Sequence, residues 1–454
     1  MSINPDIFKA YDIRGVVPKQ LDTEGAKKIG NAIVVFLARK YKKQALTIVV
    51  GADVRASSPM IKKALIEGIT LHGSSVIDIG TVTTPLFYFL LQEHASDGGV
   101  MVTASHNPPE YNGFKIRGRN TVAIAENSGL KTIQKLTGKK ELIRGKKLGS
   151  ISEKKNGADK YIAYLLKKVK LGKARVVVDA SGGAATLILP KLLSHFPGVL
   201  YKPLFFKPDG SFSHHDPNPV KPESQEFIKE ELASGSFDFG VVFDGDGDRI
   251  VFFDEFGREV RGDFIVALLA GELLKEHPKS FVVMNATASK AVEEYITSLG
   301  GKFVRTKQGY VYISSVMREK RAILGGETSH HFYFRDFGCN ESSMYALLKM
   351  LEIMARTPKK LSHLVGPLQK YVTAPETNFE VGDKARVIRA VLKYFKKDGK
   401  VSRLDGITIN FPDWWFIIRP SNTEPLIRLT VEAKTQELFD EKLKELSEFI
   451  KRAS

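Results

Sequence analysis

The sequence predicts an α/β fold with three related α/β domains, whose sheets are mixed but mainly parallel, followed by a smaller C-terminal α+β domain. Three observations support this. The 454 residues exceed what one hydrophobic core accommodates. Helix and strand patterns alternate along the first third of the chain and then restart twice, whereas the final segment has consecutive strand patterns. We expect domains at 1–150, 151–250, 251–368 and 369–454.

The first domain begins with an amphipathic helix, because residues 23–41 carry apolar side chains at helical spacing. Ser58 and Pro59 predict the cap and first turn of a second helix, which runs to Gly73. Short apolar and β-branched runs predict strands over 47–50, 75–79 and 100–103. Such alternation is typical of parallel strands covered by helices, which bind ligands beyond the carboxyl ends of the strands. Ser105 is expected in a loop of that kind.

The later domains follow from the same patterns. The second domain has predicted strands at 175–179 and 239–243, with a helical stretch to Leu193 between them. The third domain has predicted strands at 281–284, 302–305 and 322–324 and a helix at 289–299. The C-terminal domain has predicted helices at 384–396 and 436–451 and strands at 407–411, 415–419 and 427–432. Its strands predict an antiparallel sheet with helices on one face.

Composition narrows the class of protein. Hydrophobic residues make up 43% of the chain and charged residues 26%, as in ordinary soluble proteins. No apolar run is long enough to span a membrane, and the N-terminus lacks a signal-peptide pattern. The single cysteine, Cys339, suits a reducing compartment, so we expect a cytoplasmic location. The net charge of +17 is concentrated in residues 131–173, where few aromatics are interleaved, which favours a solvated linker and helix face over a nucleic-acid site.

The stretch Thr103–Pro108 places a serine beside a histidine, with a proline that stops the preceding structure. A serine hydroxyl is a poor nucleophile without a base or an electrophile, whereas a phosphorylated serine stores and donates a phosphoryl group. Lys115 could neutralise a phosphate, or transfer a proton if its pKa is lowered. Arg14 could supply another phosphate contact, and Gly51–Arg55 is interpreted as a strand end held by an Asp/Arg pair. For an isolated Ser-His pair, a simple hydrogen-bonded turn is the alternative.

The carboxylates of Asp244, Asp246 and Asp248 alternate with glycines and precede Arg249. Three carboxylates at this spacing repel one another, and a cation relieves the repulsion. Glycines let the loop turn so that all three face one point, and oxygen-only ligands favour Mg²⁺ over Zn²⁺. The sequence lacks the later glutamate of an EF-hand, which argues against a calcium sensor. Arg249 is expected to orient a carboxylate or a phosphate, and the alternative is a solvated acidic turn.

Two later loops carry groups that bind sugars and phosphates. The loop Gly325–His331 contains Glu327 and Ser329, which can bond neighbouring sugar hydroxyls. The loop Arg419–Pro425, with Arg428 close behind, combines guanidinium, hydroxyl, amide and backbone N–H groups, as a phosphate cradle does. Polar turns without a ligand are the alternative for both.

Taken in order, these four loops resemble those of the α-D-phosphohexomutase superfamily, and the resemblance covers essentially the whole chain. It is closest to the phosphomannomutase/phosphoglucomutase branch, on the segments Asn112–Lys115, Asp244–Arg249 and Arg419–Pro425. It implies four domains around a central cleft. Their expected roles are phosphoserine-bearing (1–150), metal-binding (151–250), sugar recognition (251–368) and phosphate binding (369–454).

The resemblance also implies a role for each candidate residue. Ser105 is the phosphoserine, and one of its phosphate oxygens holds Mg²⁺ together with Asp244, Asp246 and Asp248. The candidates for proton transfer and charge stabilisation are Lys115, Arg14, His106 and His331. The candidates for substrate binding are Tyr11, Arg249, Glu327, Ser329, Arg419, Ser421, Asn422, Thr423 and Arg428.

The implied activity interconverts hexose 1-phosphate and hexose 6-phosphate through a hexose 1,6-bisphosphate that turns around on the enzyme. The chain departs from close relatives at Gln308–Tyr310, Asn285 and His330, which bears on sugar preference and proton transfer. The alternatives are a phosphoglucosamine mutase and a non-catalytic protein of the same fold that binds anions or nucleic acid. The expected partners are small hexose phosphates, with no membrane, and the expected state is a monomer or weak homodimer.

Overall fold

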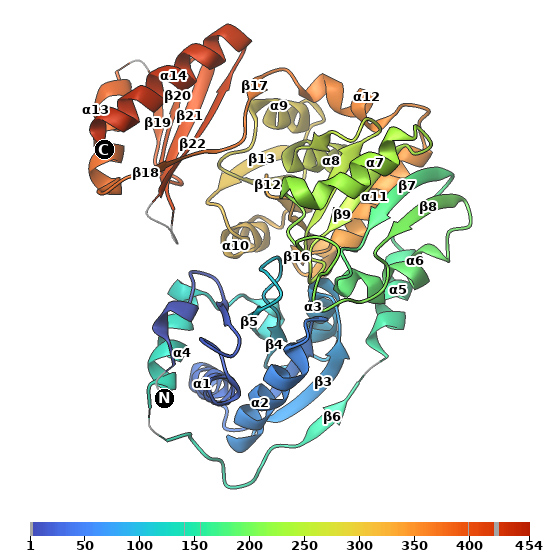
Figure 1. Cartoon of the computed structure of the whole chain (residues 1–454), viewed down its shortest axis with the longest axis vertical. Coiled ribbons are helices and arrows are strands. Elements are labelled where there is room, and N and C mark those ends of the chain that lie inside the picture. The colour runs from blue at the N-terminus through green and yellow to red at the C-terminus, as the bar shows by residue number, and fades with distance from the viewer. Residues whose placement is uncertain (1–2, 140, 155, 398, 422–425) are drawn as a thin grey trace. The chain divides into compact units, whose positions relative to one another are not determined.

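The computed structural model describes residues 3–139, 141–154, 156–397, 399–421 and 426–454 (Figure 1). Contacts divide the chain into two compact units. Unit 1 comprises Met1–Val260 and His330–Ser362, and unit 2 comprises Arg261–Ser329 and His363–Ser454. Among the described helices, none has both the length and the apolarity needed to cross a bilayer.

Unit 1 begins with a six-stranded sheet in the order β1-β5-β4-β2-β3-β6. Strands β4, β2, β3 and β6 are parallel neighbours, while β5 is antiparallel to β4 and β1. The elements of this region are β1 (Ile13–Val16), α1 (Thr23–Tyr41), β2 (Thr47–Ala52), α2 (Ser58–Leu71), β3 (Ser75–Thr81), α3 (Thr84–Glu93), β4 (Gly98–Val102), β5 (Tyr111–Gly118), α4 (Leu130–Thr137) and β6 (Ile151–Glu153).

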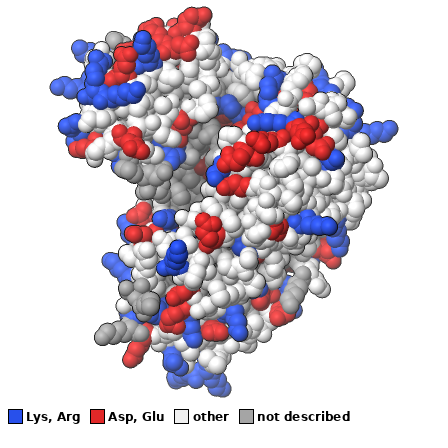
Figure 2. Space-filling view, viewed as in Figure 1, with Lys and Arg blue, Asp and Glu red and all other residues white. Residues whose placement is uncertain are grey.

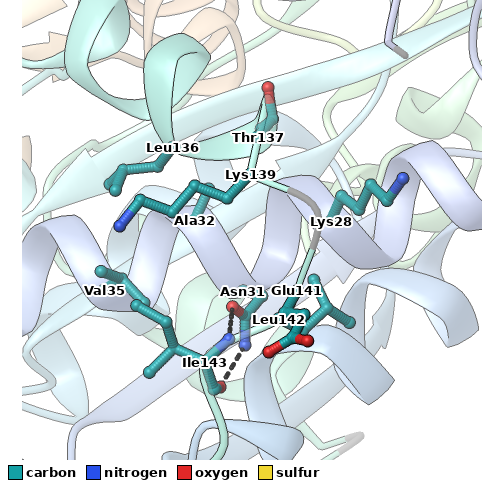
Figure 3. A pocket seen from close by; sticks show the side chains of 10 residues that line it. All are labelled: Lys28, Asn31, Ala32, Val35, Leu136, Thr137, Lys139, Glu141, Leu142 and Ile143. Carbon is teal, nitrogen blue, oxygen red and sulfur yellow. Dashed lines mark hydrogen bonds between the residues drawn. The ribbon is translucent and has the colours of Figure 1, made fainter. Parts of the chain in front are cut away.

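Helices α1, α2 and α4 cover one face of this sheet, because their apolar stripes share a core with alternate residues of β2, β4 and β5. Asn31 is a polar residue within the buried, mainly apolar face of α1, and its side-chain amide is satisfied by the backbone of Ile143. Asn31 Nδ2 donates to Ile143 O at 2.9 Å and Asn31 Oδ1 accepts from Ile143 N at 2.9 Å (Figure 3). This two-way bond ties the segment after α4 to α1, beside a small pocket.

A second sheet in unit 1 has the order β11-β10-β9-β7-β8, with β7 parallel to both β8 and β9. Its elements are α5 (Gly157–Leu166), β7 (Ala174–Asp179), α6 (Leu189–Leu193), β8 (Val199–Leu204), α7 (Glu226–Ala233), β9 (Phe239–Phe243), β10 (Ile250–Asp254) and β11 (Glu259–Val260). The chain returns to unit 1 as β15 (Phe332–Phe334), β16 (Asn340–Glu341) and α11 (Ser343–Ala355).

Unit 2 contains a parallel group, in which β12 pairs with β13 and β14. Its C-terminal sheet is antiparallel, in the order β17-β22-β21-β20-β19 with β18 beside β22, and α13 and α14 share its apolar core. The elements are α8 (Gly262–Glu276), β12 (Phe281–Asn285), α9 (Lys290–Ser298), β13 (Lys302–Thr306), α10 (Tyr310–Lys320), β14 (Leu324–Gly326), β17 (Val372–Thr373), β18 (Thr377–Glu380), α13 (Lys384–Phe395), β19 (Lys400–Ser402), β20 (Ile407–Asn410), β21 (Trp414–Pro420), β22 (Leu426–Ala433) and α14 (Gln436–Ala453). Helix α12 (Leu361–Val365) lies where the chain passes between the units.

Four local expectations were wrong. Ser57, not Ser58, is the cap residue of α2, and the Ser58 hydroxyl instead donates to Asp53 Oδ1 at 2.6 Å. The same helix ends at Leu71, before Gly73. The stretch to Leu193 breaks into a 3-10 turn and the short helix α6, and the strand expected at 322–324 begins at Leu324. In the last case the glycines of the next loop complete the strand.

Charge of both signs is interspersed on the face shown in Figure 2. In the basic stretch the described lysines are mostly solvated. The exposed lysines among the described residues of this stretch are Lys131, Lys135, Lys139, Lys146, Lys147, Lys154, Lys160, Lys167, Lys170 and Lys173. This agrees with a solvated linker and helix face.

Candidate active site

Ser105 lies in the connection between β4 and β5, three residues beyond the carboxyl end of β4. Its backbone has φ +53°, a left-handed conformation that is costly for a residue with a Cβ. Thr103 fixes the turn, because its hydroxyl accepts the Ser105 N–H at 2.8 Å and donates to Asp53 Oδ2 at 2.6 Å. The serine side chain is therefore presented by a buried, strained loop.

Arg55 holds this loop by hydrogen bonds to its backbone oxygens. Its Nη2 donates to Ser105 O and to Asn107 O, both at 2.6 Å, and its Nη1 donates to Pro108 O at 2.6 Å and to Tyr111 O at 3.1 Å. Its Nε pairs with Asp53 at 3.1 Å, and both side chains are fully buried. The Asp/Arg pair is present as expected, but it does more than hold a strand end, since it sets the path of the serine loop.

The aspartate loop joins β9 to β10, in the second sheet of unit 1. Gly247 has φ +72°, and a Cβ on Gly245 would lie 2.6 Å from Ser105 O, so both glycines are required by the backbone. One oxygen from each of Asp244, Asp246 and Asp248 lies within 4.8 Å of the others. The glycines thus let three buried carboxylates converge against the serine loop.

The serine and the aspartates are in direct contact. Ser105 Oγ donates to Asp244 Oδ2 at 2.8 Å, and Asp244 Oδ1 accepts the backbone N–H groups of Asp248 (3.0 Å) and Arg249 (3.1 Å). Burial, followed by the charges of its two neighbouring aspartates, raises the pKa of Asp244 well above its usual value. Burial also opposes ionisation of Asp248, but Lys115 and Arg249 outweigh it, so its pKa is lowered.

Lys115 projects from β5 into this group of carboxylates. Its Nζ contacts Asp246 Oδ2 at 2.6 Å and also bonds Asp248 Oδ2. Burial alone would lower the pKa of Lys115, but the charges of Asp246 and Asp248 raise it well above its usual value. These contacts favour charge neutralisation by Lys115.

The aspartate loop fits a hard divalent cation. All three carboxylates are buried, and the only ligand atoms they offer are oxygens. Asp246 Oδ1 and Asp248 Oδ1 are buried and, within the described part of the chain, have no hydrogen-bond partner. Thr84, the first residue of α3, holds the other oxygen of Asp246 with a 2.6 Å bond from its hydroxyl. Such orphaned, pre-oriented carboxylate oxygens suit Mg²⁺.

The other proton-transfer candidates surround the same loop. His106 Nδ1 lies 3.3 Å from Ser105 Oγ, and burial followed by nearby cationic groups lowers the pKa of His106 well below its usual value. Arg249 Nε donates to His331 Nε2 at 2.8 Å, and the pKa of His331 is lowered for the same reasons. Arg14 bonds Asn107 Oδ1 at 2.6 Å and Ala104 O at 3.1 Å, so it braces the serine loop from β1. Half-buried Tyr11 lies just before that strand.

The sugar-reading candidates lie in unit 2. Glu327 follows β14 and accepts the Gly309 N–H at 2.8 Å, and half-buried Ser329 lies two residues further along the loop. The residue between them, Thr328, is an anchor: its N–H donates to Asn285 Oδ1 at 3.2 Å, and its hydroxyl meets Thr287 at 3.1 Å. The unusual Asn285 therefore ties this loop to the end of β12.

The predicted phosphate cradle also lies in unit 2, and Asn422 and Thr423 fall outside the described residues. Arg419 Nε donates to Glu376 Oε1 at 3.0 Å, and Arg428 Nη1 lies 3.4 Å from Glu376 Oε2. Lys384 Nζ bonds the backbone oxygen of buried Ser421 at 2.9 Å. Two guanidinium groups and an ammonium therefore gather at one edge of the C-terminal sheet, where the Glu376 carboxylate contacts both arginines and Asp405 Oδ2 lies 3.8 Å from Arg419 Nη1.

Sequence reasoning missed the roles of several residues that shape these sites. Arg55, Thr84 and Glu376 act through contacts with residues more than forty positions away, which no local pattern reveals. Glu341 is also buried close to His331 and Asp248. Burial raises the pKa of Glu341 to about 7, and Arg117 acts in the opposite direction.

Comparison with known families covers nearly the whole chain. Models of the phosphoglucomutase/phosphomannomutase family match in four parts: α/β/α domain I at residues 5–144, domain II at 159–257, domain III at 261–371 and the C-terminal domain at 376–448.

Individual relatives agree with the family match. A phosphomannomutase of Methanocaldococcus jannaschii is 36% identical over 98% of this chain and 97% of its own. A protein of Xanthomonas campestris named for phosphohexose mutases is 36% identical, over 98% and 99%. The crystal structure of a Burkholderia thailandensis member of the phosphoglucomutase/phosphomannomutase family superposes with a TM-score of 0.90 at 31% identity, covering 99% and 98%.

Proposed function

Because the chain belongs to the phosphoglucomutase/phosphomannomutase family, we propose that it interconverts hexose 1-phosphates and hexose 6-phosphates with Ser105 as the phosphate carrier. It is an intramolecular phosphotransferase of the isomerase class. The observation that carries the proposal is the serine hydroxyl held 2.8 Å from Asp244, inside a group of three buried carboxylates and one lysine.

In the first transfer, the free hydroxyl of a hexose phosphate attacks the phosphorus of phosphorylated Ser105. The bond between phosphorus and Ser105 Oγ breaks, a bond to the sugar oxygen forms, and the hydroxyl proton passes to a base. The product is a hexose 1,6-bisphosphate. After it turns around, its other phosphate returns to Ser105 and a hexose monophosphate with the phosphate at the other position is released.

Each group of unit 1 has a part in this scheme. Asp244, Asp246 and Asp248, with a phosphoserine oxygen, would hold Mg²⁺, which supplies positive charge against the transferring group when bound. Lys115 neutralises charge, as its raised pKa favours. Arg55 and Arg14 hold the loop, and positioning of this kind supplies much of the acceleration in phosphoryl transfer. His106 is the candidate for the base, since its lowered pKa keeps the imidazole neutral, whereas His331 accepts a hydrogen bond from Arg249 through Nε2.

In unit 2, Glu327 and Ser329 would read sugar hydroxyls. Arg419, Arg428, Ser421, Asn422 and Thr423 would hold the phosphate that is not reacting. Two phosphate-binding groups are what a bisphosphate intermediate requires. A cytoplasmic location fits the single, buried Cys339. We expect a monomer or weak homodimer, which light scattering across a concentration series would test.

Phosphorus NMR tests the proposal. Mannose 1-phosphate, glucose 1-phosphate and glucosamine 1-phosphate are each mixed with the protein, Mg²⁺ and a trace of hexose 1,6-bisphosphate, with Ser105→Ala as the control. We expect conversion to the 6-phosphate, lost in the control, and relative kcat/KM values that identify the preferred sugar. If folded, phosphorylated wild-type protein converted none of the three, the mutase proposal would be rejected, and salt-dependent DNA binding would test the non-catalytic alternative.

A further inference from the structure

The imidazole of His331 lies in unit 1 with a defined hydrogen-bond partner on one side. Arg249 Nε donates to His331 Nε2 at 2.8 Å. A guanidinium Nε–H is always a donor and never an acceptor, so His331 Nε2 must present its lone pair. A neutral imidazole whose Nε2 is an acceptor carries its proton on Nδ1. The contact with Arg249 thus identifies the tautomer of His331.

Two carboxylates lie beside the ring of His331. Asp248 Oδ1 lies 3.9 Å from His331 Nδ1, and one carboxylate oxygen of Glu341 lies within 4.8 Å of a ring nitrogen of His331 and of an oxygen of Asp248. His331 Nδ1, Asp248 Oδ1 and Glu341 Oε2 are all buried, and within the described part of the chain none has a hydrogen-bond partner. Asp248 faces the proposed cation site, so Glu341 is the acceptor left for His331 Nδ1, and a water or a small side-chain movement completes the contact between them.

Glu341 also has neighbours outside the aspartate loop. It lies on β16, in register with Tyr333 of β15, the strand that follows His331 directly. Arg117 Nη2 lies 3.8 Å from Glu341 Oε2, and the Arg117 guanidinium stacks on Tyr88 at 4.4 Å and bonds its hydroxyl. Next to it, Asn340 Nδ2 donates to Thr121 Oγ1 at 2.8 Å. The positive charge of Arg117 therefore lies close to the Glu341 carboxylate, and Asn340 anchors the strand that carries it.

A second cation is a weaker explanation for the same group. A metal on His331 Nδ1 needs the lone pair of that atom, which moves the proton to Nε2, opposite the Nε–H of Arg249. Two N–H donors would then face each other at 2.8 Å. The positive charge of Arg117, 3.8 Å from Glu341, also opposes a further cation there.

We propose that Glu341 is a positioning residue for the phosphoryl-transfer site. Directly or through one water, its carboxylate accepts a hydrogen bond from the Nδ1–H of His331, which keeps the proton on Nδ1 and leaves Nε2 as the acceptor for Arg249. The proposal rests on the proposed function. Glu341 acts through His331, and the Glu341–His331–Arg249 series orders the guanidinium beside the aspartate loop. A carboxylate behind a histidine commonly fixes the tautomer and orientation of the ring in this way.

The test compares Glu341→Gln and Glu341→Asp with the wild type. Glu352→Gln is the matched control, since Glu352 is an equally buried glutamate, on α11, paired with Lys349 and Arg356 away from the site. For Glu341→Gln we expect kcat to fall about 10–100-fold with KM little changed, as for other residues that orient a functional histidine. Glu341→Asp should recover part of the loss, and Glu352→Gln should retain turnover.

A spectroscopic measurement separates positioning from a merely structural role. In full-length protein with ¹⁵N-labelled histidine, assigned with His331→Asn, we expect His331 protonated on Nδ1 in the wild type and a mixture of tautomers in Glu341→Gln. A wild-type ring protonated on Nε2 would overturn the proposal, even if the variants failed to fold. Unchanged kcat in folded Glu341→Gln, or reduced kcat with an unchanged tautomer, would also overturn it. If the wild type had no mutase activity, the function would be rejected while the nitrogen spectra still decided the tautomer.

Discussion

Replacement of Arg55 by methionine should destabilise unit 1 and disable the serine loop together. Methionine fills part of the buried volume but removes the charge and every side-chain hydrogen bond of Arg55. Asp53, 2% exposed, would be left without its cationic partner. Breaking one half of a buried ion pair costs about 3–5 kcal/mol. The carbonyl oxygens of Ser105, Asn107 and Pro108 would lose their donor as well, so we expect the upper part of that range.

Urea denaturation monitored by circular dichroism measures this loss as the change in the free energy of unfolding. The matched control is Arg175→Met. Arg175 pairs with Asp238 at 3.0 Å, but its side chain is 46% exposed, so the expected loss is only about 0–1 kcal/mol. The hydrogen bond from Arg55 to Ser105 O helps to hold Ser105 at φ +53°. Without this bond the serine loop should relax to a less strained conformation, so kcat should also fall in any Arg55→Met protein that remains folded. A loss of stability no larger than that of the control, or unchanged turnover, would refute the reasoning.

Three further predictions follow from the same structure. Chelation with EDTA should abolish mutase turnover, and added Mg²⁺ should restore it. The Asp246→Asn variant should lose about a hundred-fold or more in kcat and should respond weakly to Mg²⁺. Metal-independent turnover of the wild type would contradict this prediction. Gly245→Ala should lower the free energy of unfolding in urea by about 1–3 kcal/mol, because the new Cβ would lie 2.6 Å from Ser105 O. Gly366→Ala is the control and should leave the free energy of unfolding unchanged, because a Cβ there has no atom within 4 Å. Equal effects of the two substitutions would contradict the packing argument. Burial alone would lower the pKa of His215, but the hydrogen bond and charge of Asp179 outweigh burial and raise the pKa. The His215–Asp179 pair therefore contributes its full stability below the unfolded pKa of about 6.5, and this contribution is lost as the pH rises through the raised folded pKa. His215→Gln should therefore flatten this part of the pH dependence of unfolding, and an unchanged slope would contradict the assignment.

Most strands and helices could be predicted because apolar and β-branched runs have a period that survives in the folded protein. Helix α1 spans Thr23–Tyr41, as its apolar spacing predicts, and β9 spans Phe239–Phe243. Strand β5 was missed because Asn112 and Gly113 are poor strand formers. Burial between β1 and β4 overrides that propensity, and the strand then carries Lys115 to the aspartates.

The candidate site divides in the same way between local and distant causes. The serine and aspartate loops could be found because their chemistry lies in consecutive residues, and the structure brings Ser105 into contact with Asp244. The pairing of Arg55 with Asp53 was predicted, but its contact with the serine loop could not be, because that contact depends on carbonyl groups about fifty residues away. Glu376 is a similar case, since only the folded C-terminal sheet places it between two arginines.

The central claim is that Ser105 carries the phosphoryl group, and intact-protein mass spectrometry tests it most directly. The protein is first treated with a phosphatase, which is then removed, and glucose 1,6-bisphosphate and Mg²⁺ are added. We predict one added phosphoryl group per chain, located by peptide mapping on Ser105, with release of an equal amount of hexose monophosphate and no label on Ser105→Ala. Phosphorylation at another residue, or mutase turnover by Ser105→Ala, would contradict the account.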